Sequence, residues 1–334
     1  MEKSIPTCYN CSKLAVTFRR IDGRHLCKDC FSKWVLKIVR KTIRSKDMFG
    51  RNDRIIVGLS GGKDSTVLLD ILAKVEKKFP SKIIAVCIDE GIKGYREDGL
   101  PIAKMNAERL DIEYHQFSFK DLFGYSLDEV VIRSRELQQK LPLTRQTKII
   151  QHGACSYCGV FRRKALNFAA RKLDGDKVAT GHNLSDVSQT ILLNLLRGDS
   201  TKLLRGDLKP EKVHDSFVPR VKPLQAVAER DVVLYAFYND INYHTTECPY
   251  SIEAMRLDVR NFLAEIEEKY PGTQHSIRNS METIIEKFEK LEKPAQKTKT
   301  DKIDQMPLCK ICSEPTSNNI CKGCQMLEVL FKNN

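Results

Sequence analysis

The sequence has no long apolar stretch, and its first residues contain no apolar segment of the kind that forms a secretory signal. A membrane-spanning helix needs about 20 mostly apolar residues, so no membrane span is expected. The missing signal segment predicts a cytoplasmic location. Acidic residues are fewer than basic ones: the chain has 43 Asp and Glu and 56 Lys and Arg, and its formal net charge is +13. This excess favours a polyanionic partner such as a nucleic acid, and the cations gather at 33–46 and 162–172.

Disulfide bonds are not expected either, although the chain contains twelve cysteines. In a cytoplasmic protein, closely spaced cysteine pairs are more often metal ligands. Two segments have the paired C-x-x-C spacing of a four-thiolate zinc site, and each is too short and polar to form a core without metal. Their cysteines are Cys8, Cys11, Cys27 and Cys30 near the N-terminus, and Cys309, Cys312, Cys321 and Cys324 near the C-terminus. We therefore predict two zinc modules.

The clearest functional motif is a glycine-rich loop between an apolar run at 54–59 and a helical pattern that begins at residue 66. A strand, a glycine-rich turn and a helix N-terminus bind phosphate through backbone N–H groups and the helix dipole. Glycines let an anion approach the backbone closely, while lysine and serine add a cation and hydroxyl donors. The common P-loop has Ser or Thr after its lysine, whereas this loop has aspartate, so cleavage between the β and γ phosphates is not favoured. The loop is Ser60, Gly61, Gly62, Lys63, Asp64 and Ser65.

Residues 51–250 alternate short apolar runs with helical patterns, which predicts a doubly wound α/β domain with a parallel sheet. In a 3-2-1-4-5 strand order the first and fourth strands are neighbours, and ligands bind at their carboxyl ends. That order would bring Gly61 and Gly62 beside Gly181 and His182. His182 is therefore a candidate for nucleotide binding, and capping of the next helix is the alternative. The strands are expected at 55–59, 82–88, 113–117 and 177–180.

The rest of the chain divides by composition and periodicity. Amphipathic patterns predict helices at 31–49, 159–172, 187–196, 256–270 and 276–291. Residues 293–306 are rich in Lys, Asp, Thr and Pro without apolar periodicity, which is typical of a linker. We expect five parts: a zinc ribbon with a basic helix (1–50), the α/β domain (51–250), a helical extension (251–292), the linker (293–306) and a second zinc module (307–328).

Four cysteines lie outside the zinc modules. Cys87 falls within an apolar strand and is predicted to be a small buried hydrophobic residue. Cys155, Cys158 and Cys248 are predicted near loop–helix junctions, where cations and a helix N-terminus lower a thiol pKa. Two chemistries stay open: a persulfide and a disulfide at Cys155 and Cys248, or an iron–sulfur cluster held by all three thiols with one iron left open. A third zinc site with a non-cysteine ligand is the simpler alternative.

Taken together, these motifs resemble the PP-loop ATP pyrophosphatases with a HUP-like fold, in particular the cytosolic tRNA 2-thiouridine synthetases of the TtuA and NcsA type. That family includes the eukaryotic wobble-uridine thiolases. The resemblance covers almost the whole chain, including both zinc modules. Its motifs are SGGKDST from Ser60, DEGIxGYR from Asp89 to Arg96, CxxCGxxRR from Cys155, GHNxxD from Gly181, LRGD from Leu196, and Glu247-Cys248.

The resemblance implies ATP-dependent 2-thiolation of a tRNA uridine, with ATP split into AMP and pyrophosphate. The uridine C2 oxygen would be adenylated and then replaced by sulfur. Asp186 would be the catalytic carboxylate, and Cys155, Cys158 and Cys248 would hold a [4Fe-4S] cluster. One departure is Ser185, where relatives often have a second acidic residue. ATP with Mg²⁺ would bind at Ser60, Gly61, Gly62, Lys63, Asp64, Ser65, Asp89, Arg162, Gly181 and His182.

The target position follows from the resemblance alone. The motif at Asp89 and the pattern at 232–236 are closer to the branch that thiolates wobble uridine 34. Thiolation of ribothymidine at position 54, and a related PP-loop enzyme such as 2-thiocytidine synthetase, are the alternatives, and a non-enzymatic RNA-binding scaffold is a third.

The implied partners are tRNA, a ubiquitin-like sulfur-carrier protein, and a second subunit in a homodimer or a heterodimer with a related chain.

Overall fold

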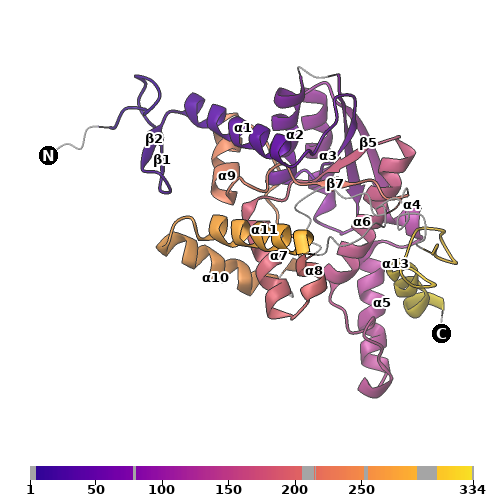
Figure 1. Cartoon of the computed structure of the whole chain (residues 1–334). Coiled ribbons are helices and arrows are strands. Elements are labelled where there is room, and N and C mark those ends of the chain that lie inside the picture. The colour runs from indigo at the N-terminus through magenta and orange to yellow at the C-terminus, as the bar shows by residue number, and fades with distance from the viewer. Residues whose placement is uncertain are drawn as a thin grey trace.

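The computed structural model describes residues 5–77, 80–204, 214, 216–251, 255–291 and 307–332, so the predicted linker at 293–306 lies outside the described residues. Its centre is a five-stranded parallel sheet with the order β5-β4-β3-β6-β7 (Figure 1). Counted along the chain this order is 3-2-1-4-5, so the predicted doubly wound sheet is confirmed. The strands are β3 (Arg54–Gly58), β4 (Lys82–Asp89), β5 (Glu113–Ser118), β6 (Lys177–Ala179) and β7 (Arg220–Val221).

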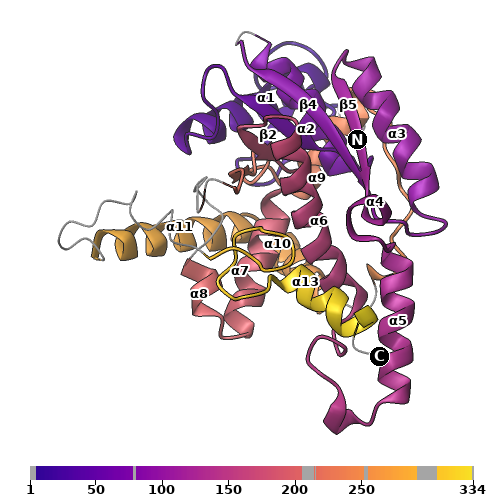
Figure 2. The same cartoon turned by 90° about the vertical axis from the view of Figure 1, so that its right-hand side faces the viewer.

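Both faces of the sheet are covered by helices, which explains why β3 and β4 are continuous apolar runs. Successive side chains of a strand point to opposite faces. Ile55 and Val57 pack on one side with α1 (Lys28–Ser45), α2 (Lys63–Glu76) and α9 (Glu229–Tyr238), while Ile56 packs on the other with α5 (Leu127–Lys140) and α6 (Ala154–Lys172). α3 (Arg96–Arg109) follows β4, and α4 (Phe119–Phe123) follows β5 (Figure 2).

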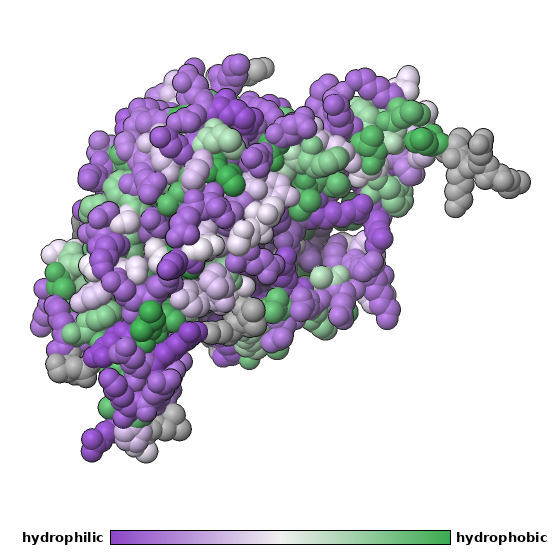
Figure 3. Space-filling model, turned by 180° about the vertical axis from the view of Figure 1, so that it is seen from behind, coloured by the Kyte–Doolittle hydropathy of each residue, from purple (hydrophilic) through white to green (hydrophobic). Residues whose placement is uncertain are grey.

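The N-terminal ribbon consists of the antiparallel strands β1 (Thr17–Arg19) and β2 (Arg24–Leu26). The helix predicted at 31–49 begins earlier, at Lys28, because the Cys27 sulfur caps it by accepting a hydrogen bond from the Cys30 backbone N–H. Large apolar side chains of the ribbon remain exposed, and Figure 3 shows hydrophobic residues gathered near the N-terminal end of the chain on an otherwise mostly hydrophilic face. They are Ile5, Tyr9, Leu14, Val16, Phe18 and Ile21.

Two helices after residue 255 cover α7 (Leu184–Leu196). α11 (Thr273–Leu291) packs Met281 and Ile285 against Val187 and Ile191, and α10 (Arg256–Lys269) packs against Leu193. The C-terminal module, with α13 (Lys322–Leu327) and a π-helical turn η3 (Glu328–Lys332), lies beside α5 and α6 and far from the N-terminal ribbon (Figures 1 and 2). Short helical segments also occur at α8 (Ser200–Leu204) and at η1 (Leu143–Arg145).

The predicted boundaries of two helices are wrong in a way that matters for the site. The helix expected at 159–172 begins at Ala154, so Cys155 and Cys158 lie in its first turns. The helix expected at 187–196 begins at Leu184, which places Asp186 inside its first turn. Among the helices that the structure describes, none is long and apolar enough to cross a lipid bilayer.

Candidate active site

The glycine-rich loop follows β3 and leads directly into α2. Gly61 has a φ of +87°, and a Cβ at this position would lie 2.3 Å from the Gly99 carbonyl oxygen of α3. The Ser60 and Ser65 hydroxyls are 3.0 Å apart, and Ser65 Oγ also accepts a hydrogen bond from the Ser60 backbone N–H. The first N–H groups of a helix have no partner within the helix. The loop therefore has the geometry of an anion site at the N-terminus of α2. Residues 60–65 are the candidate phosphate loop.

Lys63 lies in this first turn between two carboxylates. Its Nζ is 2.8 Å from Asp64 Oδ2 and 2.9 Å from Glu229 Oε1. Burial opposes the charge of Lys63, but the two carboxylates outweigh burial and raise its pKa. Burial also raises the pKa of Asp64, whose Oδ1 accepts a hydrogen bond from Asn183 Nδ2 at 2.9 Å. The lysine is thus held as a cation at the mouth of the loop.

The loop after β6 lies directly against the glycine-rich loop. A Cβ on Gly181 would be 2.8 Å from the backbone of Asp64 and Ser65, so the predicted adjacency of the two loops is confirmed. Asn183, and not His182, caps α7, and it forms a capping box with Asp186. The alternative interpretation of His182 as the cap is therefore wrong. Its Nδ1 lies 2.8 Å from Thr180 Oγ1.

Asp186 is tied to the helices that cover α7. Its Oδ1 lies 3.2 Å from Arg256 Nη2 on α10, a partner that the sequence analysis missed. Ser185, the position where relatives often have an acid, donates a hydrogen bond to Gln274 Oε1 on α11. The second carboxylate is thus replaced by a buried contact between helices.

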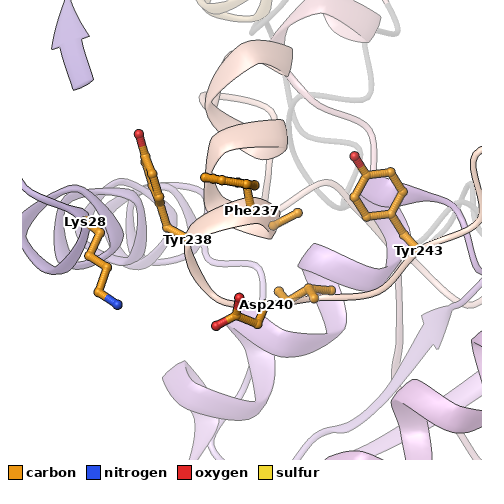
Figure 4. Close-up of a pocket in the computed structure, with 7 residues that line it drawn as sticks. Lys28, Phe237, Tyr238, Asp240 and Tyr243 are labelled. Atoms are coloured by element: carbon orange, nitrogen blue, oxygen red, sulfur yellow. The ribbon is translucent and has the colours of Figure 1, made fainter. Parts of the chain in front are cut away.

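Two cavities lie near α9. The larger, of about 950 Å³, opens beside Lys63 and extends between the ribbon, α9 and α10, where Trp34, Arg230 and Arg260 line it. The smaller, of about 400 Å³, lies between the start of α1 and the end of α9 and contains none of the predicted site residues (Figure 4). Of these two cavities, the larger is lined by Lys63 of the glycine-rich loop, which makes it the candidate entrance for a substrate.

The three remaining cysteines of the predicted site come together from two segments. Cys155 and Cys158 lie at the start of α6, and Cys155 Sγ is 3.4 Å from the Tyr250 carbonyl oxygen, two residues after Cys248. Cys248 packs in the same apolar cluster as Cys158. Burial raises the pKa of Cys158 to about 11, with smaller contributions from the charges of Cys248 and Cys155, while Arg162 works against the rise.

These three thiols are not packed as closely as the ligands of a zinc ion. Among the described residues, only the two four-cysteine sets place three or more metal-binding atoms within 4.8 Å of one another. A third zinc site would need such close packing, so this arrangement does not support that alternative. Cys87 is fully buried, as predicted, and it accepts a hydrogen bond from Arg96 Nη2 at 3.1 Å.

The segment after β4 connects the cysteines with the phosphate loop. Arg162, predicted to bind nucleotide, donates to Cys158 Sγ at 3.1 Å and to Glu90 Oε1 at 2.8 Å. Arg96 donates to the Ser60 carbonyl oxygen at 2.9 Å. The sequence analysis quoted Glu90 and Arg96 within a motif but assigned neither a role. Asp89 accepts a hydrogen bond from the Gly91 backbone N–H at 2.8 Å, which shapes the turn.

One further residue of the site has no signal in the sequence. The His244 backbone N–H donates to the Gly61 carbonyl oxygen at 2.8 Å, and the same residue forms a parallel bridge with Gly62. This strand-like contact fixes the chain just before Cys248. The phosphate loop and the third cysteine are therefore held by a single short segment.

The geometry of both four-cysteine sets fits zinc. A tetrahedral site with Zn–S bonds of about 2.3 Å separates its sulfurs by about 3.8 Å. The Sγ atoms of Cys11 and Cys27 are 3.6 Å apart, and those of Cys312 and Cys321 are 3.7 Å apart. Lys164 of α6 lies 2.9 Å from Cys312 Sγ, so a cation faces the C-terminal thiolates.

Known proteins resemble this chain over most of its length. The family model of the PP-loop domain matches residues 35–267. The tRNA 2-thiolation protein NcsA of Haloferax volcanii is 36% identical, over 96% of this chain and 98% of that protein. Cytoplasmic tRNA 2-thiolation protein 1 of Danio rerio is 36% identical, over 97% and 88% respectively.

A solved structure extends the likeness to three dimensions. It is the U34-tRNA thiolase NcsA from Methanococcus maripaludis with its [4Fe-4S] cluster, with a TM-score of 0.78 and 33% identity, and the match covers 97% of this chain and 96% of that one. Likeness over nearly the full length, in sequence and in fold, identifies this chain as a member of the PP-loop family and, within it, of the NcsA and cytoplasmic tRNA 2-thiolation protein 1 group.

Proposed function

We propose that the protein is an ATP-dependent tRNA 2-thiolase that acts in the cytoplasm on wobble uridine 34. The observation that carries the proposal is that the phosphate loop and the three-cysteine centre are joined through Arg96, Glu90 and Arg162. Likeness to the two tRNA 2-thiolation proteins, one of them cytoplasmic, supports tRNA as substrate and a cytoplasmic location, and likeness to the Methanococcus maripaludis thiolase supports uridine 34 and a [4Fe-4S] cluster.

In this proposal the loop from Ser60 to Ser65 binds the ATP phosphates, together with Gly181, His182 and Asp89, and Mg²⁺ accompanies the phosphates. Lys63 stabilises the negative charge that develops when the bond between the α-phosphorus and its bridging oxygen breaks. Asp64 and Glu229 keep this lysine charged in the free protein. Asp186 serves in metal or proton handling, and Arg256 orients it.

The reaction has two displacements. The C2 oxygen of uridine attacks the α-phosphorus, and pyrophosphate leaves, so a poor leaving oxygen becomes part of AMP. Sulfur then bonds to C2, and AMP departs with the original oxygen. Cys155, Cys158 and Cys248 would hold the [4Fe-4S] cluster, which would supply iron to carry sulfur when it is bound. The two four-cysteine modules hold structural zinc, and a ubiquitin-like carrier or free sulfide supplies the sulfur.

The test is an anaerobic reaction of the iron-loaded protein with Mg-ATP, sulfide and a tRNA transcript that has uridine at position 34. We expect 2-thiouridine by nucleoside mass spectrometry, with AMP and pyrophosphate in equal amounts. A transcript with cytidine at position 34 should gain no sulfur. Thiolation of that transcript at position 54 would move the target to the T-loop, and formation of ADP with phosphate would contradict the proposed reaction.

Two variants connect the assay with the site. Lys63→Ala should lose thiolation and AMP formation, whereas Lys77→Ala, which removes an exposed lysine just after the same helix, should retain both. Cys155→Ala should lose iron and thiolation together. Full activity in Cys155→Ala would exclude the three-cysteine centre from the reaction.

A further inference from the structure

A continuous chain of charged contacts joins the phosphate loop to the cysteine centre. Arg96 Nη1 donates to the Ser60 carbonyl oxygen at 2.9 Å, and Arg96 Nε lies 3.0 Å from Glu90 Oε2. Glu90 Oε1 accepts from Arg162 Nε at 2.8 Å, and Arg162 Nη2 donates to Cys158 Sγ at 3.1 Å. Each oxygen of a single carboxylate thus faces one guanidinium group, and each guanidinium group reaches one end of the site.

The carboxylate of Glu90 is shielded from solvent, so water cannot replace the arginines as its partners. Glu90 is 2% exposed and Arg96 is 3% exposed. Loss of the carboxylate would leave two cations facing each other without a counter-charge, and an unpaired buried charge is strongly unfavourable. A hydrogen bond to a charged group is also stronger than one between neutral groups. The charge of Glu90 therefore contributes to holding both arginines, beside the hydrogen bond that Arg96 Nη2 donates to the Ile88 carbonyl oxygen at 3.0 Å.

The backbone holds Glu90 at a fixed point between the two ends. Its carbonyl oxygen accepts a hydrogen bond from the Leu127 N–H at 2.7 Å. The next residue, Gly91, has a φ of +68°, and a Cβ there would lie 2.6 Å from the Ser126 Cβ. Because the turn is packed against the start of α5, the backbone from which the Glu90 carboxylate extends is anchored to this helix.

We propose that Glu90 is a positioning residue that holds Arg162 against Cys158 and Arg96 against Ser60 at the same time. The inference rests on the proposed function and deepens it. The adenylated uridine must meet sulfur at its C2 atom, and a misplacement of about 1 Å costs about a hundredfold in rate. Glu90 sets the distance between the nucleotide loop and the thiols, although it contacts neither the loop backbone nor a cysteine itself.

The test measures both ends in Glu90→Gln, which keeps the shape of the side chain and removes its charge. One readout is the dissociation constant of α,β-methylene-ATP for the cluster-free, zinc-bound protein by calorimetry. The other is the rate at which an iron chelator removes iron from the anaerobically loaded protein. We expect each to worsen about tenfold in Glu90→Gln, because the variant loses the ion pair with Arg96 at one end and the charged hydrogen bond with Arg162 at the other. Glu90→Asp, which keeps the charge but is one methylene shorter, should worsen each about threefold.

A matched control and a double-mutant cycle separate positioning from general destabilisation. Glu76→Gln alters another buried carboxylate, which accepts from Ser81 at the far end of α2, and it should change neither readout. Arg162→Gln should release iron as fast as Glu90→Gln, and the double variant should release it no faster than Arg162→Gln alone. Additive effects in the double variant would overturn the inference, because Glu90 would then act without Arg162.

The outcomes also distinguish this inference from the proposed function. A wild-type chain that takes up no cluster and thiolates no tRNA defeats the proposed function and, with it, the inference. If the wild type thiolates tRNA but Glu90→Gln alters only nucleotide affinity, only iron release or neither, the inference is overturned and the proposed function stands. If Glu90→Gln does not fold, Glu90→Asp decides: it must shift both readouts in the same direction, and a shift at one end only refutes the link.

Discussion

Replacement of Gly61 by alanine is the sharpest test of the phosphate loop. Gly61 has a φ of +87°, and an added Cβ would lie 2.3 Å from the Gly99 carbonyl oxygen. Two separate penalties follow. An L-residue at positive φ costs about 1–2 kcal/mol wherever it occurs. The contact with a backbone oxygen adds a displacement, because ordinary van der Waals contact begins at 3.4 Å and the loop must therefore move by 1.1 Å.

The second penalty acts on function more than on folding. A shift of about 1 Å in a reacting group costs about a hundredfold in rate, so we expect that loss in AMP formation for Gly61→Ala. Gly124 supplies the matched control: its φ is +81°, and an added Cβ would meet nothing within 4 Å. Gly124→Ala therefore suffers the strain without the displacement, at the end of α4.

The assay compares both variants for thermal midpoint, for affinity toward α,β-methylene-ATP and for AMP formation with tRNA. Both should lower the midpoint by a few degrees, since each has the same strain. Only Gly61→Ala should lose nucleotide affinity and turnover. If Gly61→Ala bound nucleotide as well as the wild type, the loop would not be the phosphate site. An equal loss in Gly124→Ala would assign the effect to general destabilisation.

Three further predictions concern other parts of the chain. Lys164→Met should release zinc from the C-terminal module about tenfold faster to a colorimetric chelator, because the cation beside Cys312 is lost, and the N-terminal module serves as the internal control. Burial raises the pKa of Asp231 from 3.8 to about 6, so its contribution to stability is present below pH 3.8 and is lost as the pH rises through 6. Asp231→Asn should therefore raise the thermal midpoint at neutral pH and leave it unchanged in acid; an equal rise at both would contradict this. Cys248→Ala should abolish iron binding with little change in midpoint, since Cys248 is only half-buried, and iron retained by this variant would remove it from the centre.

Much of the fold follows from local patterns. Apolar runs separated by helical patterns predict a parallel sheet, and the rules for crossover connections leave few strand orders to consider. That reasoning was enough to bring Gly181 beside the glycine-rich loop. The paired cysteines predict both metal modules by spacing alone, because a tetrahedral site demands two tight turns. These features depend on residues close together in the chain or on a single topological rule.

The contacts that complete the site depend on packing and have no such pattern. His244 meets Gly61 through its backbone, so its side chain carries no signal. Glu90 connects two arginines only because a separate element, α6, brings Arg162 against the carboxylate that Arg96 also contacts. The start of α6 was also misplaced, because glycine and cysteine are weak helix formers and the segment from Ala154 resembles a loop in sequence.

α6 connects the C-terminal module with the cysteine pair Cys155 and Cys158, although the module lies apart from the glycine-rich loop. α6 carries Cys155 and Cys158 at its start, Arg162 one turn later, and then Lys164, whose Nζ lies 2.7 Å from Glu314 Oε2 and 2.9 Å from Cys312 Sγ. At 1.5 Å per residue, Lys164 is about 9 Å along the helix from Cys158. A helix is stiff over this length, so a module that fixes Lys164 also limits rotation and sliding of the thiols. We therefore expect metal binding at the C-terminal module to influence the geometry of Cys155 and Cys158 through α6.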